Sequence, residues 1–217
     1  MFIREDSIII ESDNLKEIST KLAMYFQNKN AVIVGNAASG KTAIAEITIQ
    51  KLDGTHKLIY CDDYLRQEGL SALMLSIERH NMVPQSTRKK LIIEGCLGYR
   101  LLRKCAKREI DFFPDIIVEI KVNNFQQYKF MELDERKIDY AEYKMNYLRM
   151  NKSLNTIFND FLNINDRYFE HIIVENTFHR WVKVQKVTNS TIEVQKSIFY
   201  LFVLCCTLLK YEEVTII

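Results

Sequence analysis

The segment GNAASGKT, from Gly35 to Thr42, has the residue types and spacing of a loop that binds phosphate groups. Its two glycines, Gly35 and Gly40, let the backbone curl so that successive N–H groups point toward phosphate oxygens. Lys41 is placed to reach the β- and γ-phosphates of a nucleoside triphosphate, and the Thr42 hydroxyl to ligate Mg²⁺. The candidate site for ATP or GTP with Mg²⁺ therefore comprises Gly35, Asn36, Ala37, Ala38, Ser39, Gly40, Lys41 and Thr42.

Carboxylates follow two further apolar segments of the chain. Asp62 and Asp63 end the segment KLIYCDD, and Glu94 precedes the glycine that ends KKLIIEG. If these segments are parallel strands, their carboxyl ends share one edge with the phosphate loop. Phosphoryl transfer needs one carboxylate to orient or accept the proton of the acceptor hydroxyl, and another to hold water on Mg²⁺. The candidate catalytic residues are Lys41, Asp62, Asp63 and Glu94, and the candidate metal ligands are Thr42 and Glu94. The alternative is that Asp62 only caps a helix and that Glu94 is merely solvated.

Five short apolar segments rich in Ile and Val predict the strands that must position these residues. They are Ala31–Gly35, Lys57–Asp63, Lys89–Gly95, Pro114–Ile120 and His171–Asn176. Near-continuous apolar runs are typical of parallel strands buried on both faces, and segments with helical spacing lie between them. The pattern predicts an α/β fold in three layers, with a mostly parallel sheet of about five strands. A short SIII segment could add an edge strand, and Ser12 or Asp13 could cap the helix that follows.

The stretch over 122–167 is far longer than a plain crossover between parallel strands, which needs about a dozen residues. It is polar, rich in tyrosine and helical in pattern, so we expect a helical insertion within a single domain covering residues 1–217. A C-terminal helix is predicted over 190–211. Because this helix is apolar almost all round, we expect it to be buried in the domain or in a homodimer interface.

Together, the segments GNAASGKT, IYCDDY and LIIEG resemble P-loop kinases of the uridine kinase and zeta-toxin type, and the resemblance covers residues 31–95. It implies a P-loop NTPase fold in which Asp62 or Asp63 activates the acceptor and Glu94 positions metal or substrate. The implied reaction transfers a γ-phosphoryl group from ATP or GTP to a small-molecule acceptor such as a nucleoside, nucleotide or sugar nucleotide. The stretch between the second and third predicted strands is short for a uridine kinase.

In kinases of this kind, the segment between the fourth and fifth strands closes over the triphosphate as a lid and commonly supplies cations to the transferring phosphoryl group. The resemblance therefore makes the insertion a candidate lid. Its candidate cations are Arg136, Lys137, Lys144, Arg149 and Lys152. Arg66, four residues after Asp62, resembles a basic residue found near this motif in some members of the family. The alternative is that these charges form the solvated faces of helices.

A second group of cations lies on one face of a helix predicted over YRLLRKCAKR. Its members are Arg100, Arg103, Lys104, Lys107 and Arg108, and we call them the basic stripe. Such a stripe could bind a polyanion, such as the end of a nucleic acid or a phosphorylated metabolite. The alternative is an ordinary amphipathic surface helix. No aromatic residue interleaves with the stripe, which disfavours binding of single-stranded nucleic acid.

The composition narrows the classes of protein further. With 47% hydrophobic and 27% charged residues, the 217-residue chain is not a disordered protein. With a net charge of +2, the chain has no overall positive field that would attract nucleic acid or anionic membrane. Only local basic patches could bind them. Five cysteines without CxxC spacing predict reduced thiols in a cytoplasmic protein and no zinc site. The longest apolar run, Ile198 to Leu209, is too short for the roughly 20 residues of a membrane span.

The alternative function to a kinase is a nucleotide-binding NTPase or switch that acts through a macromolecular partner.

Overall fold

The structure is a computed structural model that describes residues 7–12, 14–36, 39–65, 69–122 and 140–176. The chain divides into two compact units, the first comprising 1–125 and 154–178 and the second comprising 126–153 and 179–217. Most of the described residues, and all of the described strands, belong to the first unit. The C-terminal helix predicted over 190–211 lies outside the described residues.

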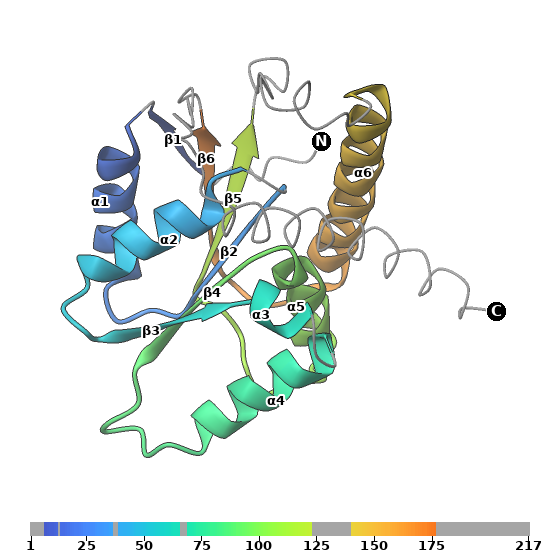
Figure 1. Cartoon of the computed structure of the whole chain (residues 1–217). Coiled ribbons are helices and arrows are strands. Elements are labelled where there is room, and N and C mark those ends of the chain that lie inside the picture. The colour runs from blue at the N-terminus through green and yellow to red at the C-terminus, as the bar shows by residue number, and fades with distance from the viewer. Residues whose placement is uncertain (1–6, 13, 37–38, 66–68, 123–139, 177–217) are drawn as a thin grey trace, which may run out of the picture. The chain divides into compact units, whose positions relative to one another are not determined.

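The first unit is built on one sheet in which every adjacent pair of strands is parallel. In chain order, the strands are β1 (Ile8–Ser12), β2 (Ala31–Gly35), β3 (His56–Tyr60), β4 (Lys90–Glu94), β5 (Ile116–Val122) and β6 (Glu170–Asn176). Their order across the six-stranded sheet is β1-β6-β5-β2-β4-β3 (Figure 1). The predicted α/β fold with a parallel sheet is therefore confirmed. All five predicted strands are present, and the SIII segment supplies the sixth, at one edge.

Six helices accompany these strands among the described residues: α1 (Leu15–Phe26), α2 (Lys41–Gln50), α3 (Asp62–Leu65), α4 (Leu70–Asn81), α5 (Leu97–Ala106) and α6 (Tyr140–Ile164). α1 begins after Asn14, whose side chain accepts hydrogen bonds from the backbone N–H groups of Lys16 and Glu17. The predicted cap at Ser12 or Asp13 is therefore wrong. The Ser12 hydroxyl instead donates to the Glu17 carboxylate at 2.8 Å, just outside the helix.

One face of the sheet is covered by α1 and α2, which lie together on one side of the strands in Figure 1. α1 contributes Leu22 and Phe26, and α2 contributes Ile44; none of these side chains is exposed. They pack on alternate strand residues such as Ile33 and Val118. Because β2 is buried along its whole length, the Ile- and Val-rich sequence AVIVG forms a central strand with no polar face.

The opposite face of the sheet is covered by α5 and by the last part of α6. Gly98 of α5 lies so close to β2 that a Cβ atom there would stand 2.9 Å from Val34. Aromatic rings continue the layer: the centroids of Tyr99 and Phe158 are 5.7 Å apart, and those of Phe161 and Phe169 are 5.5 Å apart. The first unit is thus a three-layer α/β structure, in which two helical layers enclose the sheet.

The insertion predicted over 122–167 contains α6, a helix of 25 residues. Residues 123–139 lie outside the described part of the chain, and the helix runs from the second unit into the first. Within the described ranges, no helix is both long enough and apolar enough to cross a membrane.

Candidate functional site

The predicted site residues on three strands meet at one edge of the sheet. The phosphate-loop segment leaves the carboxyl end of β2 and leads into α2, which begins at Lys41. Glu94 is the last residue of β4, and Asp62 lies two residues beyond the end of β3. The chain adds β3 and β4 on one side of β2, and β5 and β6 on the other. The side on which strands are added therefore reverses at β2. In open parallel sheets, ligands bind at such a point, outside the carboxyl ends of the strands.

The backbone of the loop needs glycine at both of its ends. Gly35 has a φ of +154°, and a Cβ atom there would stand 2.7 Å from the carbonyl oxygen of Ile120 on the neighbouring strand. Gly40, at the N-cap of α2, has a left-handed φ of 89°. Between them, the Ser39 N–H donates to the Asn36 carbonyl at 3.2 Å, which closes a tight turn. Ala37 and Ala38 lie outside the described residues.

Lys41 is held inside the loop and leaves only 6% of its surface exposed. Its Nζ donates to the carbonyl oxygen of Asn36 at 2.6 Å, so the ammonium group lies across the turn. Burial raises the pKa of both Asp62 and Glu94, and the positive charge of Lys41 lowers both by a smaller amount. A single cation therefore faces both the loop backbone and the acidic ends of β3 and β4.

Glu94 is the most buried carboxylate of the site, with 2% of its surface exposed. Burial raises its pKa to about 7, while Lys41 and the hydrogen bond from Thr42 lower it and Asp62 raises it further. The Thr42 hydroxyl donates to Glu94 Oε1 at 3.3 Å. The structure thus brings together the two residues that the sequence predicted as metal ligands, one from α2 and one from β4.

Asp62 begins α3 instead of ending a strand, because β3 stops at Tyr60. Burial raises the pKa of its carboxyl, Lys41 lowers it and Asp63 raises it. Asp63 also begins α3, and both aspartates expose much of their surface to solvent, although the carboxyl group of Asp62 is partly desolvated. Both aspartates therefore stand at the carboxyl edge, as predicted, but on a short helix that follows the strand. The charge of Lys41 acts on Asp62, and the charge of Asp62 acts on Glu94.

Two residues of this edge escaped the sequence analysis. The Tyr60 hydroxyl donates to Glu46 Oε1 at 3.2 Å, and burial and the charges of Glu46, Glu94 and Asp63 raise the pKa of Tyr60. Glu46 follows Thr42 by four residues on α2, a spacing that places both on one helix face. This spacing could have identified Glu46 as a neighbour of the site. Tyr60 could have been found as the last residue of the strand before the two aspartates.

The residues at this edge fit a magnesium nucleotide better than they fit a metal ion alone. No group of three or more His, Cys, Asp or Glu side chains among the described residues could hold a metal ion. Mg²⁺ is usually held by one or two carboxylates together with substrate phosphates. The Thr42 hydroxyl and the Glu94 carboxylate are hydrogen-bonded at 3.3 Å, and the ammonium group of Lys41 is buried. These groups match that kind of donor set. Among the described cysteines, Cys61 and Cys105 are buried free thiols.

The predicted lid cations lie either outside the described residues or in the second unit. Arg66, Arg136 and Lys137 lie outside the described residues, and the side chain of Lys144 is not described. Arg149 and Lys152 are exposed residues of α6 in the second unit. Their proposed contact with a triphosphate stays a prediction.

The basic stripe has acidic partners that its own sequence did not reveal. α5 ends at Ala106, and Arg108 has a left-handed φ of 59°, so the predicted helix is shorter than expected at this end. Arg103 lies 3.9 Å from Asp160, Lys104 lies 2.5 Å from Glu109 and Arg108 lies 2.8 Å from Asp166. These acids neutralise three of the five cations, which weighs against binding of a polyanion.

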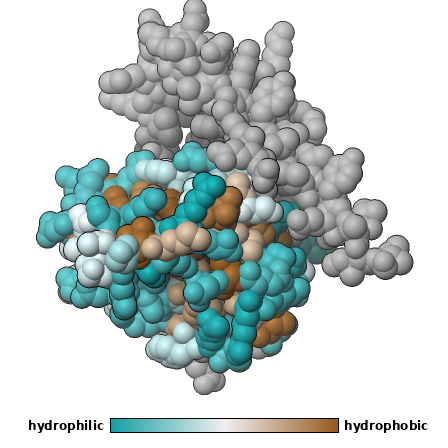
Figure 2. Space-filling model, turned by 90° about the horizontal axis from the view of Figure 1, so that it is seen from below, coloured by the Kyte–Doolittle hydropathy of each residue, from teal (hydrophilic) through white to brown (hydrophobic). Residues whose placement is uncertain are grey.

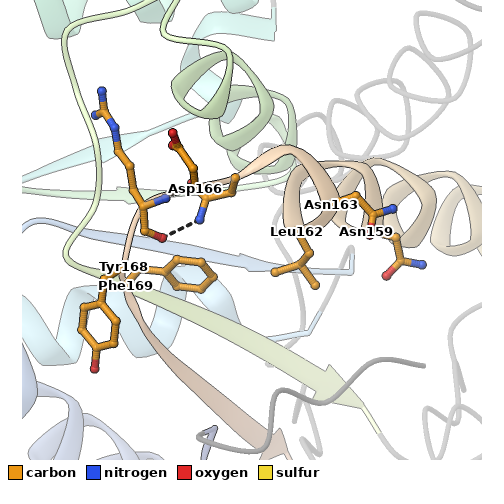
Figure 3. Close-up of a pocket in the computed structure, with 8 residues that line it drawn as sticks. Asn159, Leu162, Asn163, Asp166, Tyr168 and Phe169 are labelled. Atoms are coloured by element: carbon orange, nitrogen blue, oxygen red, sulfur yellow. Dashed lines mark hydrogen bonds between the residues drawn. The ribbon is translucent and has the colours of Figure 1, made fainter.

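A hollow of about 690 Å³ lies elsewhere on the first unit, where α6 ends and β6 begins (Figure 3). It is lined by Asn159, Leu162, Asn163, Asn165, Asp166, Arg167, Tyr168 and Phe169. Within this lining, Asn165 Nδ2 donates to the Arg167 carbonyl at 2.6 Å. The hollow is at the amino edge of β6, whereas Lys41, Asp62 and Glu94 are at the carboxyl edge, so it is separate from the candidate site.

Comparison with models of protein families finds no match for this chain, and comparison with curated proteins finds no significant similarity in sequence.

Proposed function

We propose that the protein is a P-loop kinase that transfers the γ-phosphoryl group of ATP or GTP to a hydroxyl group of a small molecule. The observation that carries this proposal is the meeting of Lys41, Thr42, Glu94 and Asp62 at the carboxyl ends of three neighbouring strands. The acceptors that we favour are nucleosides, nucleotides and sugar nucleotides, as the resemblance of these segments to uridine kinase-like and zeta-toxin-like kinases implies.

Each residue has a role in this reaction. The loop from Gly35 to Gly40 and the N-terminus of α2 bind the phosphates through backbone N–H groups. Lys41 leaves the Asn36 carbonyl and binds the β- and γ-phosphates. Thr42 and Glu94 hold Mg²⁺, which neutralises negative charge on the phosphates when it is bound.

Asp62 is the residue that we assign to the acceptor. The acceptor oxygen forms a bond to the γ-phosphorus, the bond from that phosphorus to the bridging oxygen breaks, and ADP or GDP leaves. The proton of the acceptor hydroxyl passes to the Asp62 carboxylate. Burial raises the pKa of Asp62, and a base whose pKa lies nearer to neutrality accepts a proton more effectively. We favour Asp62 over Asp63 because its charge interacts with both Lys41 and Glu94.

The experiment compares Lys41→Met, Asp62→Asn and a control, Lys51→Met, which changes an exposed lysine just beyond α2. Calorimetry measures the affinity for the magnesium nucleotide, and transfer of label from γ-labelled ATP is measured over a panel of acceptors. We expect Lys41→Met to lose nucleotide binding. We expect Asp62→Asn to retain binding but transfer at a rate lower by about 100-fold or more.

Unchanged nucleotide affinity in Lys41→Met would contradict the phosphate-loop assignment. Transfer at the parental rate in both Asp62→Asn and Asp63→Asn would remove the acceptor-activating group. If the parent hydrolyses ATP slowly and no acceptor in the panel accelerates turnover, the protein is a nucleotide-dependent switch and the kinase proposal is wrong.

A further inference from the structure

The segment that joins α4 to β4 presents large apolar side chains to water beside several cations. Met82 exposes 81% of its surface and Val83 exposes 37%. Arg79, Arg88 and Lys89 are exposed as well. We call these five residues the α4 tip. Figure 2 views the molecule from below, the side on which α4 lies in Figure 1, and apolar surface is visible there among hydrophilic residues.

The α4 tip is held in shape by hydrogen bonds across its base. His80 Nε2 donates to the Lys89 carbonyl at 2.8 Å, and Arg88 Nε donates to the Val83 carbonyl at 2.8 Å. The Val83 N–H donates to the His80 carbonyl at 3.1 Å. These bonds fix the backbone on both sides of Met82, so the loop presents this residue to solvent. Met82 and Val83 are adjacent and both exposed, and adjacent apolar side chains rimmed by polar residues mark interaction surfaces.

The charge of the tip's own segment is positive, and Asp111, whose backbone carbonyl accepts a hydrogen bond from Asn81, adds one acid beside it. Between Glu78 and Lys90 the sequence contains the cations Arg79, Arg88, Lys89 and Lys90 and a single acid, Glu78. Within the ranges that the structure describes, Arg79 and Lys89 form no ion pair. This sets the tip apart from the basic stripe of α5, where acids neutralise three of the cations.

We propose that the α4 tip docks the protein onto the surface of an anionic phospholipid bilayer. Met82 and Val83 would enter the boundary between headgroups and acyl chains, and the three cations would face the anionic headgroups. A bilayer suits this surface better than an acidic protein helix does, because Met82 stands on a protrusion, whereas a helix needs a groove to receive it. The tip precedes the amino end of β4, so docking leaves the carboxyl edge open to nucleotide. The proposal is independent of the kinase assignment.

The test measures sedimentation of the full chain with vesicles of phosphatidylcholine alone and with vesicles that also contain phosphatidylserine. Two double variants remove the two kinds of contact: Met82→Ser with Val83→Ser, and Arg79→Glu with Lys89→Glu. Arg88 is retained because it braces the loop. The matched controls are Met24→Ser, at a residue 69% exposed on α1, and Lys16→Glu with Lys51→Glu, at exposed lysines far from the tip in sequence.

We expect the parent to bind only the vesicles that contain phosphatidylserine. The charge-reversed variant should bind them at least about 20-fold more weakly, since each surface cation contributes about fivefold. The apolar variant should bind at least about tenfold more weakly, and the controls should match the parent. Thermal midpoints should not change, because all four side chains are exposed. If a double variant fails to fold, the single substitutions Met82→Ser and Lys89→Glu provide the same comparison.

Equal sedimentation of the parent with both kinds of vesicle would overturn the proposal. So would an equal loss of binding in the control variants. If the apolar variant binds these vesicles as tightly as the parent, Met82 and Val83 do not enter the bilayer and the proposal is wrong.

Discussion

Glu94 keeps its carboxyl group almost completely out of water, and replacing it with glutamine should stabilise the nucleotide-free protein above neutral pH. The folded chain holds the pKa of Glu94 at about 7, against 4.5 for an ordinary glutamate side chain. Between these two pH values the folded chain retains a proton that the unfolded chain has released. The unfolding free energy therefore falls as the pH rises from 4.5 to about 7, and it stays lower above that range.

The magnitude follows from this difference in pKa. At about 1.4 kcal/mol per pKa unit, the stability lost on ionising Glu94 amounts to roughly 3 kcal/mol. Glu94→Gln keeps the size of the side chain and removes the ionisation. We therefore expect the variant to be more stable than the parent by up to about 3 kcal/mol near pH 8, and equally or slightly less stable near pH 4.5. The same substitution should weaken binding of the magnesium nucleotide if Glu94 is a metal ligand.

The assay is urea unfolding followed by circular dichroism from pH 4.5 to pH 8.5, with a chelator present. The parent's profile alone is not decisive, because burial lowers the pKa of His56, which makes stability rise with pH in the acidic range. The difference between parent and Glu94→Gln isolates the effect of Glu94. Glu78→Gln, at an exposed residue of α4, serves as the control and should follow the parent. Parallel profiles for parent and Glu94→Gln would refute this reasoning.

Three other variants, two single and one double, test the fold and the surface. Gly35→Ala places a Cβ atom 2.7 Å from the Ile120 carbonyl at a φ of +154°, so urea unfolding should show a loss of at least about 2 kcal/mol, and an unchanged midpoint would contradict the described loop. Phe161→Ala empties a fully buried position and should cost about 3 to 5 kcal/mol in the same assay, while a loss below about 1 kcal/mol would mean that its layer is not packed as described. Arg103→Glu with Lys107→Glu should leave binding of duplex DNA, measured by fluorescence anisotropy, at the background level of the parent. Tight binding by the parent, with a slope of log affinity against log salt concentration near −0.9 for each phosphate contact, would instead show that the basic stripe binds nucleic acid.

The strands could be predicted from the sequence because their signal is local. A run such as AVIVG is apolar at every position, and only burial on both faces stabilises such a run. The carboxyl-edge position of Glu94 follows directly from its place at the end of a strand. The motif from Gly35 to Thr42 was likewise recognisable because loop, lysine and hydroxyl lie within eight consecutive residues.

The errors arise where neighbours compete or where the partner is distant in sequence. Ser12, Asp13 and Asn14 are all good helix caps, and only the backbone geometry selects Asn14. Two of the three acids that neutralise the basic stripe are equally hidden, since Asp160 and Asp166 lie more than 50 residues beyond it, whereas Glu109 directly follows the stripe. No helical spacing within a single segment reveals such a pairing.

The place of β1 in the sheet has a consequence for how the chain folds during synthesis. β1 pairs with β6 alone among the described strands, and Ile8 lies opposite Ile172. β1, the first of the described strands to be synthesised, therefore has no partner until β6, the last of them, has been made. Such long-range closure is slow and leaves a bare strand edge exposed in the meantime. We expect nascent chains that stop before Glu170 to lack protection from hydrogen exchange in β1, and chains that extend past Asn176 to acquire it.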